Sequence, residues 1–334
     1  MGYDPRRKLI TLKSKTHKKT IYVPLLLLLS AFLLSQCDNS TNVETKSPKI
    51  DLELEKAKFG KLLFFDKRLS VNNSVACITC HDPNKAFTDG EIKSKGVFGR
   101  LALRNAPTLL NVKDAPHFMF DGAVPTLEMQ AIIPIQDHNE MGFQMGELVE
   151  KLRGDAVYAK KAVKLYRRKL DAFVITRSLA AFQRTLISED SKFDEFVKSN
   201  FTKGLSEEEK IGWELFSEKF GCISCHALPH FTSYEMKINH LAKITELDQG
   251  RYRITGDSAD IGKFKTPTLR NIILTFPYMH DGSINSLEEV LKMYEINRLK
   301  FDDSRMKKFQ PSEKEKKNII LFLSALTDER HLSE

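Results

Sequence analysis

The chain has 334 residues, of which 41% are hydrophobic and 29% charged. It is long enough for two ordinary domains with a buried core and therefore needs no scaffold of disulfides. The formal net charge is +8, but segment 1–36 holds seven Lys or Arg residues and one Asp and leaves the rest near +2, so nucleic-acid binding has little support.

The N-terminal segment has the pattern of a secretory signal peptide. Its basic residues lie between positions 6 and 19, and an apolar run follows from Ile21 to Leu34. This run is short for a membrane-spanning helix, which favours a signal peptide over 1–36, with an uncleaved membrane anchor as the alternative. The letters LLSQC resemble a lipoprotein signal-peptidase site. They predict lipid on Cys37, a lipidated tether over 37–52 and a membrane-anchored protein in the periplasm.

Four of the five cysteines lie in two copies of a CxxCH motif, CITCH at 77–81 and CISCH at 222–226. Two thiols three residues apart can form thioether bonds with the vinyl groups of haem, and the adjacent His then reaches the iron. The predicted haem-binding residues are Cys77, Cys80, His81, Cys222, Cys225 and His226. A zinc site shared by both pairs, or two redox-active disulfides, would not explain why His follows each pair.

The predicted elements are helical. An apolar helix is expected over 171–187, and a helix over 205–220 begins with the Ser206 and Glu209 pattern of a capping box. Similar starts precede helices near Ser286 and Ser312. Long strand patterns are missing from the sequence. We therefore predict a mainly α fold.

The two halves of the chain form an internal repeat. APTLLN at 106–111 matches TPTLRN at 266–271, and FDGAVPTLEM at 120–129 matches HDGSINSLEE at 280–289, both at an offset of 160 residues. The haem motifs differ by 145, so a loop-like insert of fifteen residues follows the second motif. The repeat predicts two cytochrome c-like haem domains, an N-terminal peroxidatic domain over 53–200 and a C-terminal electron-transfer domain over 201–334.

Several segments carry a resemblance to a known family. They are LLFFDKRLSVNNSVACITCHDPNKAFTDG, LRNAPTLLN, LEMQAIIPIQDHNEMGF, AAFQRTLIS and KFKTPTLRNIILTFPYMHDG. In this order they resemble the bacterial di-haem cytochrome c peroxidases, including the related di-haem enzymes that mature methylamine dehydrogenase, over about residues 53–327. The resemblance implies two covalently bound haem c groups. Peroxide would react at the N-terminal haem, and the C-terminal haem would receive and store electrons.

The resemblance also assigns residues on the peroxide side. Glu140, in the letters NEM, matches the acid beside the peroxidatic haem, and Gln130 and Pro134 match other residues of that pocket. Such an acid is needed because hydrogen peroxide must lose a proton from one oxygen and gain one on the leaving oxygen. Without the resemblance, Glu140 would be interpreted as a solvated loop carboxylate.

The family further implies one calcium ion between the domains. Its protein ligands would be the side chain of Asn105 and the carbonyl groups of Thr275 and Pro277. Hard oxygen donors of this kind suit calcium, and water would complete the coordination. The alternative is that these are ordinary turn residues.

Two positions depart from the family pattern. Classical peroxidases carry a distal His before the RN dipeptide, but Val97 stands at the aligned position, and His117 nearby is expected to pack in the core. The first haem should therefore be open without prior reduction. Phe120 stands where the family usually has Trp between the haems, and Trp213 is expected to pack before the second haem. The electron path at Phe120 would then use tunnelling rather than a Trp radical.

Tyr294 is the predicted sixth ligand of the second haem iron. It lies nineteen residues after Thr275, where the peroxidases have Met and the methylamine-dehydrogenase-maturing enzymes have Tyr. Subtracting the repeat offset of 160 leads to Pro134, which has no donor for iron. Met279 and Met293 are competing ligands, although Met293 would point about 100° away from Tyr294 on a helix.

These features predict an exported di-haem peroxidase that reduces hydrogen peroxide with electrons from a small redox protein, such as a cytochrome c or a cupredoxin. Two alternatives remain open. The first is a di-haem oxidase that acts on a protein or organic substrate through a high-valent iron state, which Tyr294 favours and Phe120 weakens. The second is a non-enzymatic electron carrier, which would need neither an open iron nor Glu140. A homodimer is compatible with the sequence.

Overall fold

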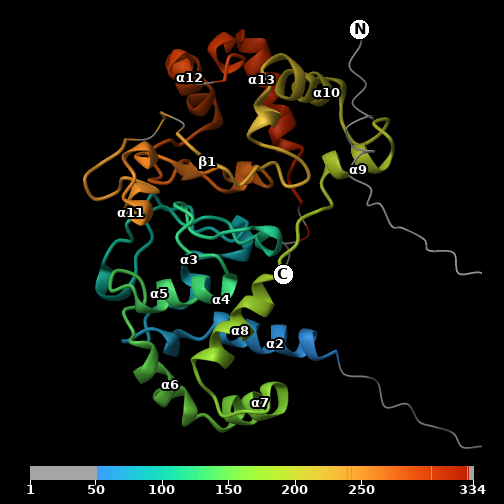
Figure 1. Ribbon diagram of the computed structural model, residues 1–334. Helices are drawn as coiled ribbons and strands as arrows, with labels where there is room; N and C mark the ends of the chain where they lie inside the picture. The colour runs from blue at the N-terminus through green and yellow to red at the C-terminus, as the bar shows by residue number, and fades with distance from the viewer. Residues whose placement is uncertain (1–50, 239, 242, 302, 329, 331–334) are drawn as a thin grey trace, which may run out of the picture. The chain divides into compact units, whose positions relative to one another are not determined.

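The computed structural model describes residues 51–238, 240–241, 243–301, 303–328 and 330 (Figure 1). The expected signal peptide, Cys37 and nearly all of the tether lie outside these residues. Both haem motifs belong to one compact unit, Ile50–Glu334. Within the described residues, no helix is both long enough and apolar enough to cross a membrane.

The same pair of packed helices occurs in each half of the chain. In the first half, α2 (Leu52–Phe64) packs against α8 (Ala172–Gln183), and in the second, α10 (Glu207–Glu214) packs against α13 (Glu313–Ser324). A Cβ atom at Gly60 would lie 1.8 Å from the Ser178 carbonyl oxygen. At Gly212 it would lie 2.0 Å from the Asn318 carbonyl oxygen. Both crossings therefore depend on glycine because the two backbones touch.

Short helices and turns connect these pairs, as expected for a mainly α chain. The longer remaining helices are α6 (Met145–Arg153), α7 (Ala156–Tyr166), α9 (Lys192–Lys198) and α12 (Leu287–Asn297). The short ones are α3 (Cys77–Cys80), α4 (Leu127–Gln130), α5 (Ile132–Gln136) and α11 (Tyr252–Thr255). Two short strands, β1 (Met236–Lys237) and β2 (Phe264–Lys265), pair antiparallel, with Met236 opposite Lys265.

Helix starts follow the predicted capping chemistry. Ser206 and Ser312 each form a full capping box with the Glu three residues later. Ser286 also caps its helix through the Glu289 N–H, but the Glu289 carboxylate accepts from the Asn285 N–H at 3.1 Å instead of closing the box on Ser286. The expected helix over 205–220 is α10, followed by a π-helical turn over Leu215–Lys219.

Backbone geometry supports the internal repeat. Asn111 and Asn271 both adopt the left-handed conformation, with φ of 57° and 58°. Seven residues after each, an isolated bridge forms, Phe118 with Val124 and Tyr278 with Ile284. The matched turns differ by the offset of 160 residues found in the sequence.

The buried side chains form one large cluster in each half. The first includes residues from Phe59 to Leu186, and the second includes residues from Phe193 to Leu326. Trp213 packs in the second, 5.0 Å from Phe193 between ring centroids, as expected for a packing residue. Because Phe193 already belongs to the second cluster, the change of core falls before residue 200, and the domain boundary near 200 remains a prediction.

Candidate haem sites and the peroxide side

Each CxxCH motif presents a His whose ring is held by a backbone carbonyl group. The Nδ1 atom of His81 lies 2.9 Å from the Phe87 carbonyl oxygen, and Nδ1 of His226 lies 3.2 Å from that of Phe231. A proton on Nδ1 that donates to the carbonyl leaves Nε2 with its lone pair for a metal. This is the orientation that an iron-ligating His requires, so the residues present fit haem.

A matched pair of threonines braces the loops that hold these histidines. Thr108 Oγ1 donates to the Ala86 carbonyl at 2.6 Å, and Thr268 Oγ1 donates to the His230 carbonyl at 2.5 Å. Ala86 and His230 immediately precede the two phenylalanines that accept from the haem histidines. In both halves, the threonine of the PTL sequence therefore stabilises the loop that holds the haem-ligating histidine. The sequence showed these threonines only as part of a repeat, because the partner is a backbone atom more than twenty residues away.

The side chains of the four motif cysteines are partly exposed. Burial of the sulfur atoms raises the pKa of Cys77 and Cys222 to about 12 and that of Cys80 to about 11. Over the part of the chain that the structure describes, no three His, Cys, Asp or Glu residues gather as a metal site. Separate haem attachment at the two motifs is supported by the oriented His in each of them.

Glu140 lies in a loop beside the first motif. Its charge contributes to the raised pKa of both Cys77 and Cys80, which places its carboxyl group near the thiols that would hold haem. Burial, followed by repulsion from Asp137, raises the pKa of Glu140 from 4.5 to about 7. A carboxyl group that titrates near neutrality can both accept and return a proton at ordinary pH.

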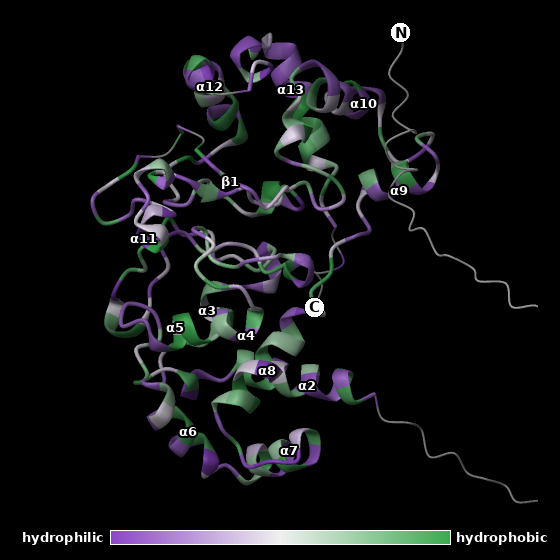
Figure 2. Cartoon of the chain, viewed as in Figure 1, coloured by the Kyte–Doolittle hydropathy of each residue, from purple (hydrophilic) through white to green (hydrophobic). Residues whose placement is uncertain are grey.

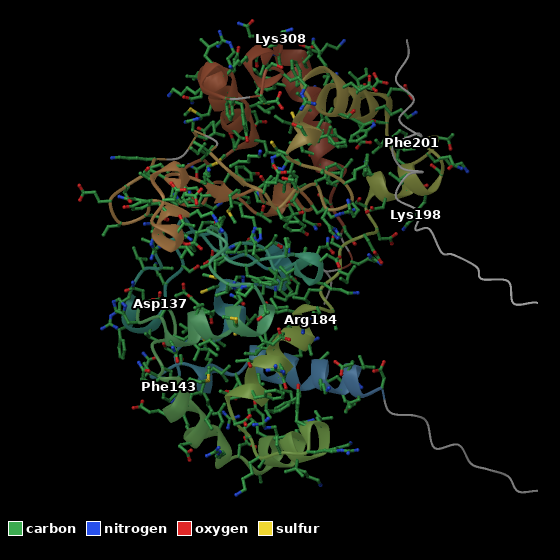
Figure 3. All side chains as sticks on the ribbon, viewed as in Figure 1. Asp137, Phe143, Arg184, Lys198, Phe201 and Lys308 are labelled. Carbon is green, nitrogen blue, oxygen red and sulfur yellow. The ribbon has the colours of Figure 1, made fainter. Side chains whose placement is uncertain are left out.

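The neighbours of Glu140 include one of the two other expected pocket residues. Pro134, in α5, accepts a backbone hydrogen bond from Met141 at 3.1 Å. Gln130 ends α4 and is partly exposed. Figure 3 labels Asp137 and Phe143, which bracket this loop. The roles of Gln130 and Pro134 remain predictions.

Val97 is fully buried against the Glu140 loop. Its N–H donates to the Glu140 carbonyl at 2.8 Å, and its side chain belongs to the first core cluster. A valine offers iron no donor atom. His117 is only half-buried, and its carbonyl accepts from Lys265 Nζ at 3.3 Å, so it lies beside the second half of the chain rather than in the first core.

Tyr294 lies on α12 near the second haem motif. Its ring stacks on Phe301 with 5.4 Å between centroids. Burial raises the pKa of the Tyr294 phenol, with a further contribution from the Cys222 and Cys225 thiols. The phenol is therefore near the atoms that would hold the second haem. Met279 and Met293 pack against the same core cluster, so the identity of the sixth ligand remains a prediction.

The expected calcium ligands occupy two segments that meet. Asn105 N–H donates to the His280 carbonyl at 2.9 Å, three residues from Pro277. The Asn105 Nδ2 group donates to the Glu91 carbonyl at 2.8 Å, which leaves the side-chain oxygen for a cation. This contact brings Asn105 against the chain a few residues after Thr275 and Pro277, and a calcium site shared by the three residues remains a prediction.

Residue Phe120 connects the first half of the chain to the second. Its carbonyl accepts from the Lys265 N–H at 2.6 Å. Nearby, the largely buried side chain of Arg104 pairs with Asp121 at 2.8 Å and with Asp248 at 2.7 Å. Asp248 comes from the insert that follows the second haem motif, so the insert contributes to this contact.

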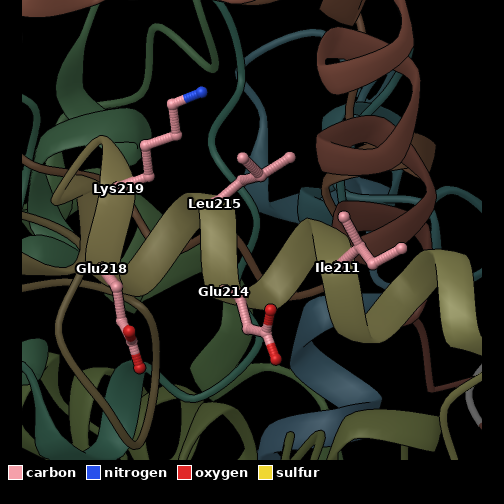
Figure 4. Close-up of a pocket in the computed structure, with 5 residues that line it drawn as sticks. All are labelled: Ile211, Glu214, Leu215, Glu218 and Lys219. Carbon is pink, nitrogen blue, oxygen red and sulfur yellow. The ribbon is translucent and has the colours of Figure 1, made fainter. Parts of the chain in front are cut away.

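Two surface hollows lie in the described part of the chain, and only the second is lined by a residue of the haem sites described above, Phe87. One, of about 440 Å³, is on α10 and the following turn and is lined by Ile211, Glu214, Leu215, Glu218 and Lys219 (Figure 4). The other, of about 420 Å³, lies between α2 and the end of α8. Neither is lined by a residue of a CxxCH motif. The chemistry of the motifs, rather than the size of a hollow, defines the candidate sites.

Comparisons with known proteins agree with this geometry. A family model described as di-haem cytochrome c peroxidase matches residues 54–202. The methylamine utilization protein MauG of Methylorubrum extorquens is 36% identical over 284 residues, or 82% of this chain and 79% of that protein. The cytochrome c551 peroxidase of Nitrosomonas europaea is 33% identical over 279 residues, or 82% and 80%.

Solved structures are similar as well. The crystal structure of a MauG-like protein associated with microbial copper homeostasis matches with a TM-score of 0.76 and 31% identity, over 84% of this chain and 91% of that one. The di-haem peroxidase BthA from Burkholderia thailandensis matches with a TM-score of 0.71 and 21% identity, which supports the fold alone.

A mainly helical chain with two repeated CxxCH sites, each with an oriented His, defines a c-type protein with two haem-attachment sites. This chain belongs to the family of di-haem cytochrome c peroxidases that includes MauG.

Proposed function

We propose that the protein is a periplasmic cytochrome-c peroxidase that reduces hydrogen peroxide to water. The observation that carries this proposal is the Glu140 carboxyl group, with its pKa raised to about 7, near the Cys77 and Cys80 thiols. Val97, at the position of the usual distal His, leaves that side free of a protein ligand for iron. When bound, the haems would pass electrons from the donor to peroxide and supply the iron at which peroxide reacts.

The remaining functions would be carried out by residues of the chain. Glu140 would accept the proton that peroxide loses and return one to the leaving oxygen. Phe87 and Phe231 would fix the orientation of the two haem histidines through their carbonyl groups. Lipid on Cys37 would hold the enzyme at a membrane, and Asn105, Thr275 and Pro277 would bind calcium.

A second candidate function is oxidation of a protein or organic substrate. The 36% identity to MauG and a Tyr at position 294 favour it, whereas Phe120 in place of Trp weakens it. Turnover of hydrogen peroxide with a reduced small cytochrome would separate the candidates. Rapid turnover supports the peroxidase. The second function is supported if peroxide oxidises this protein by two electrons and the oxidised protein accepts no electrons from the cytochrome.

The first testable prediction concerns access to the first haem. Because Val97 and Pro134 offer iron no ligand, the fully oxidised holoprotein should show one high-spin haem by electron paramagnetic resonance. Cyanide should bind to it without prior reduction. Two low-spin signals together with slow cyanide binding would contradict this expectation.

The surface beside the second haem motif is basic, and we propose it as the docking site of an electron donor with an acidic face. Arg305 packs on Gly221, and Asp303 accepts from the exposed Ser224 at 3.3 Å, so these two residues lie against the motif. Lys300, Lys307 and Lys308 are exposed, and the described residues offer them no ion pair. Leu299, 72% exposed, adds an apolar centre. Figure 3 labels Lys308 on this surface, and Figure 2 shows hydrophilic and hydrophobic residues in turn along α12 and α13.

The second prediction tests this surface. Reversing the charge of Lys307 and Lys308 to Glu should lower the second-order rate with an acidic donor about tenfold at low salt, since complementary charge speeds encounter. The loss should shrink as salt screens the charges. The matched control reverses Lys160 and Lys164 on α7, which are also exposed. Equal effects of both double variants, or no effect of either, would rule out this docking surface.

A further inference from the structure

A turn over residues 95–101 presses on the backbone of Glu140. We propose that Gly96 is a positioning residue of the peroxide site, and that its missing side chain lets this turn fix the Glu140 carboxyl group in place. The inference rests on the proposed role of Glu140. In this protein the turn carries Val97 instead of a ligating His, and its proposed role is to position Glu140.

The contact itself leaves no room for a side chain. A Cβ atom at Gly96 would lie 2.0 Å from the Asn139 carbonyl oxygen, 2.5 Å from the Glu140 carbonyl oxygen and 2.7 Å from the Glu140 Cα. The backbone of Gly96 has φ of −88° and ψ of −158°, which any L-residue can adopt. Glycine is therefore required by the close approach and not by the conformation of the turn.

The turn is also fastened to the Glu140 segment by hydrogen bonds. Val97 N–H donates to the Glu140 carbonyl at 2.8 Å, and the Arg100 guanidinium donates to the His138 carbonyl at 3.1 Å. Glu140 N–H in turn donates to the Asp137 carbonyl at 3.0 Å. Both backbone polar groups of Glu140 are thus held, one by its own loop and one by the turn.

Hydrogen bonds within the turn also hold its shape, so the turn cannot move away from Glu140 without breaking them. Gly96 N–H donates to the Arg100 carbonyl at 2.8 Å, Arg100 N–H donates to the Val97 carbonyl at 3.2 Å, and Lys95 bridges Leu101. An added methyl group must therefore displace the Asn139–Glu140 peptide or break the turn. Moving a catalytic group by about 1 Å can cost about 10²-fold in rate.

The test is Gly96→Ala in the holoprotein, with Gly146→Ala as the matched control. A Cβ at Gly146 meets no atom within 4 Å, so the control adds the same methyl group in open space. We expect Gly96→Ala to slow the stopped-flow reaction with hydrogen peroxide about 10²-fold. Gly146→Ala should keep the wild-type rate. The spectrum of the second haem should be unchanged in both.

A double-mutant cycle separates positioning from general damage. If Gly96 acts through Glu140, Gly96→Ala should cost little further rate once Glu140 is Gln. The pH profile of the single variant should also shift. The groups that interact electrostatically with Glu140 include Asp137 and the Cys77 and Cys80 thiols, which thioether formation removes, and the packed turn adds the charged Arg100. A wild-type rate for Gly96→Ala, or an undiminished loss in the Gln background, overturns the inference.

Arg100→Met covers the case in which Gly96→Ala does not fold. Arg100 is exposed, so its loss removes the bond to His138 without a clash. A several-fold lower rate that disappears in the Glu140→Gln background supports the inference, and an unchanged rate opposes it. If Glu140→Gln alone has no effect on peroxide, the proposed role of Glu140 fails first, which is a different outcome from failure of Gly96 to act.

Discussion

Replacing Glu140 by Gln should slow the reaction with hydrogen peroxide by about 10²–10⁴-fold, the usual scale for a lost acid–base group. Gln has nearly the same shape, so both haems should remain attached and the helical fold should persist. The Gln side chain cannot accept the peroxide proton, which is the reason for the slower rate. Stopped-flow mixing with peroxide, together with the haem absorption spectrum and circular dichroism, measures all three expectations.

The same residue should control the pH dependence. Because burial raises the pKa of Glu140 to about 7, the carboxylate that accepts the proton becomes abundant only as pH rises through that value. The wild-type rate should therefore increase around pH 7, and the Gln variant should lose this step. Folding also raises this pKa above its ordinary 4.5, so the stabilising contribution of the protonated carboxyl is lost as pH rises from about 4.5 to about 7.

Thermal unfolding of wild type and variant gives an independent check on the environment of Glu140. The Gln variant should lack the fall in stability between these pH values. Glu147→Gln is the matched control, because Glu147 is exposed on α6 in the same region of the chain. An unchanged peroxide rate for Glu140→Gln would assign proton transfer to another group.

Local chemistry made much of this fold predictable from the sequence. The capping patterns at Ser206 and Ser312 require only neighbouring residues, and the structure confirms them. The two haem motifs, the repeat and the family resemblance likewise depend on short stretches of sequence. The resemblance supplied Glu140, which no local rule separates from a solvated loop acid.

Contacts between distant backbones could not be predicted in the same way. The sequence does not distinguish Gly60, Gly96 and Gly212 from other glycines. In the structure, a Cβ atom added at any of the three would lie within 2.0 Å of a carbonyl oxygen. The Thr108 and Thr268 braces also end on backbone carbonyls far away in sequence. These residues are required by tertiary packing, and contacts of this kind cannot be predicted from composition or periodicity.

Tyr294→Met should raise the reduction potential of the second haem. A phenolate is a hard anionic ligand that stabilises ferric iron, whereas a thioether stabilises ferrous iron, and axial ligands span about 0.8 V across haem proteins. A Tyr ligand would make this haem a weak store of reducing electrons, so the catalytic cycle would begin from the oxidised protein. That expectation agrees with a first haem that needs no reductive opening. Spectroelectrochemical titration of both haems measures the potentials.

Two further variants decide whether Tyr294 is the ligand. Tyr294→Phe should remove the phenol and change the spectrum of the second haem while α12 stays folded, since the ring can still stack on Phe301. Met293→Leu should leave both spectrum and potential unchanged. If instead both Tyr294 variants keep the wild-type spectrum and potential, Met279 or Met293 becomes the better candidate. The proposal of a second, substrate-oxidising function would then lose the main sequence feature that supports it, because a Met-ligated second haem is the arrangement expected of the peroxidases.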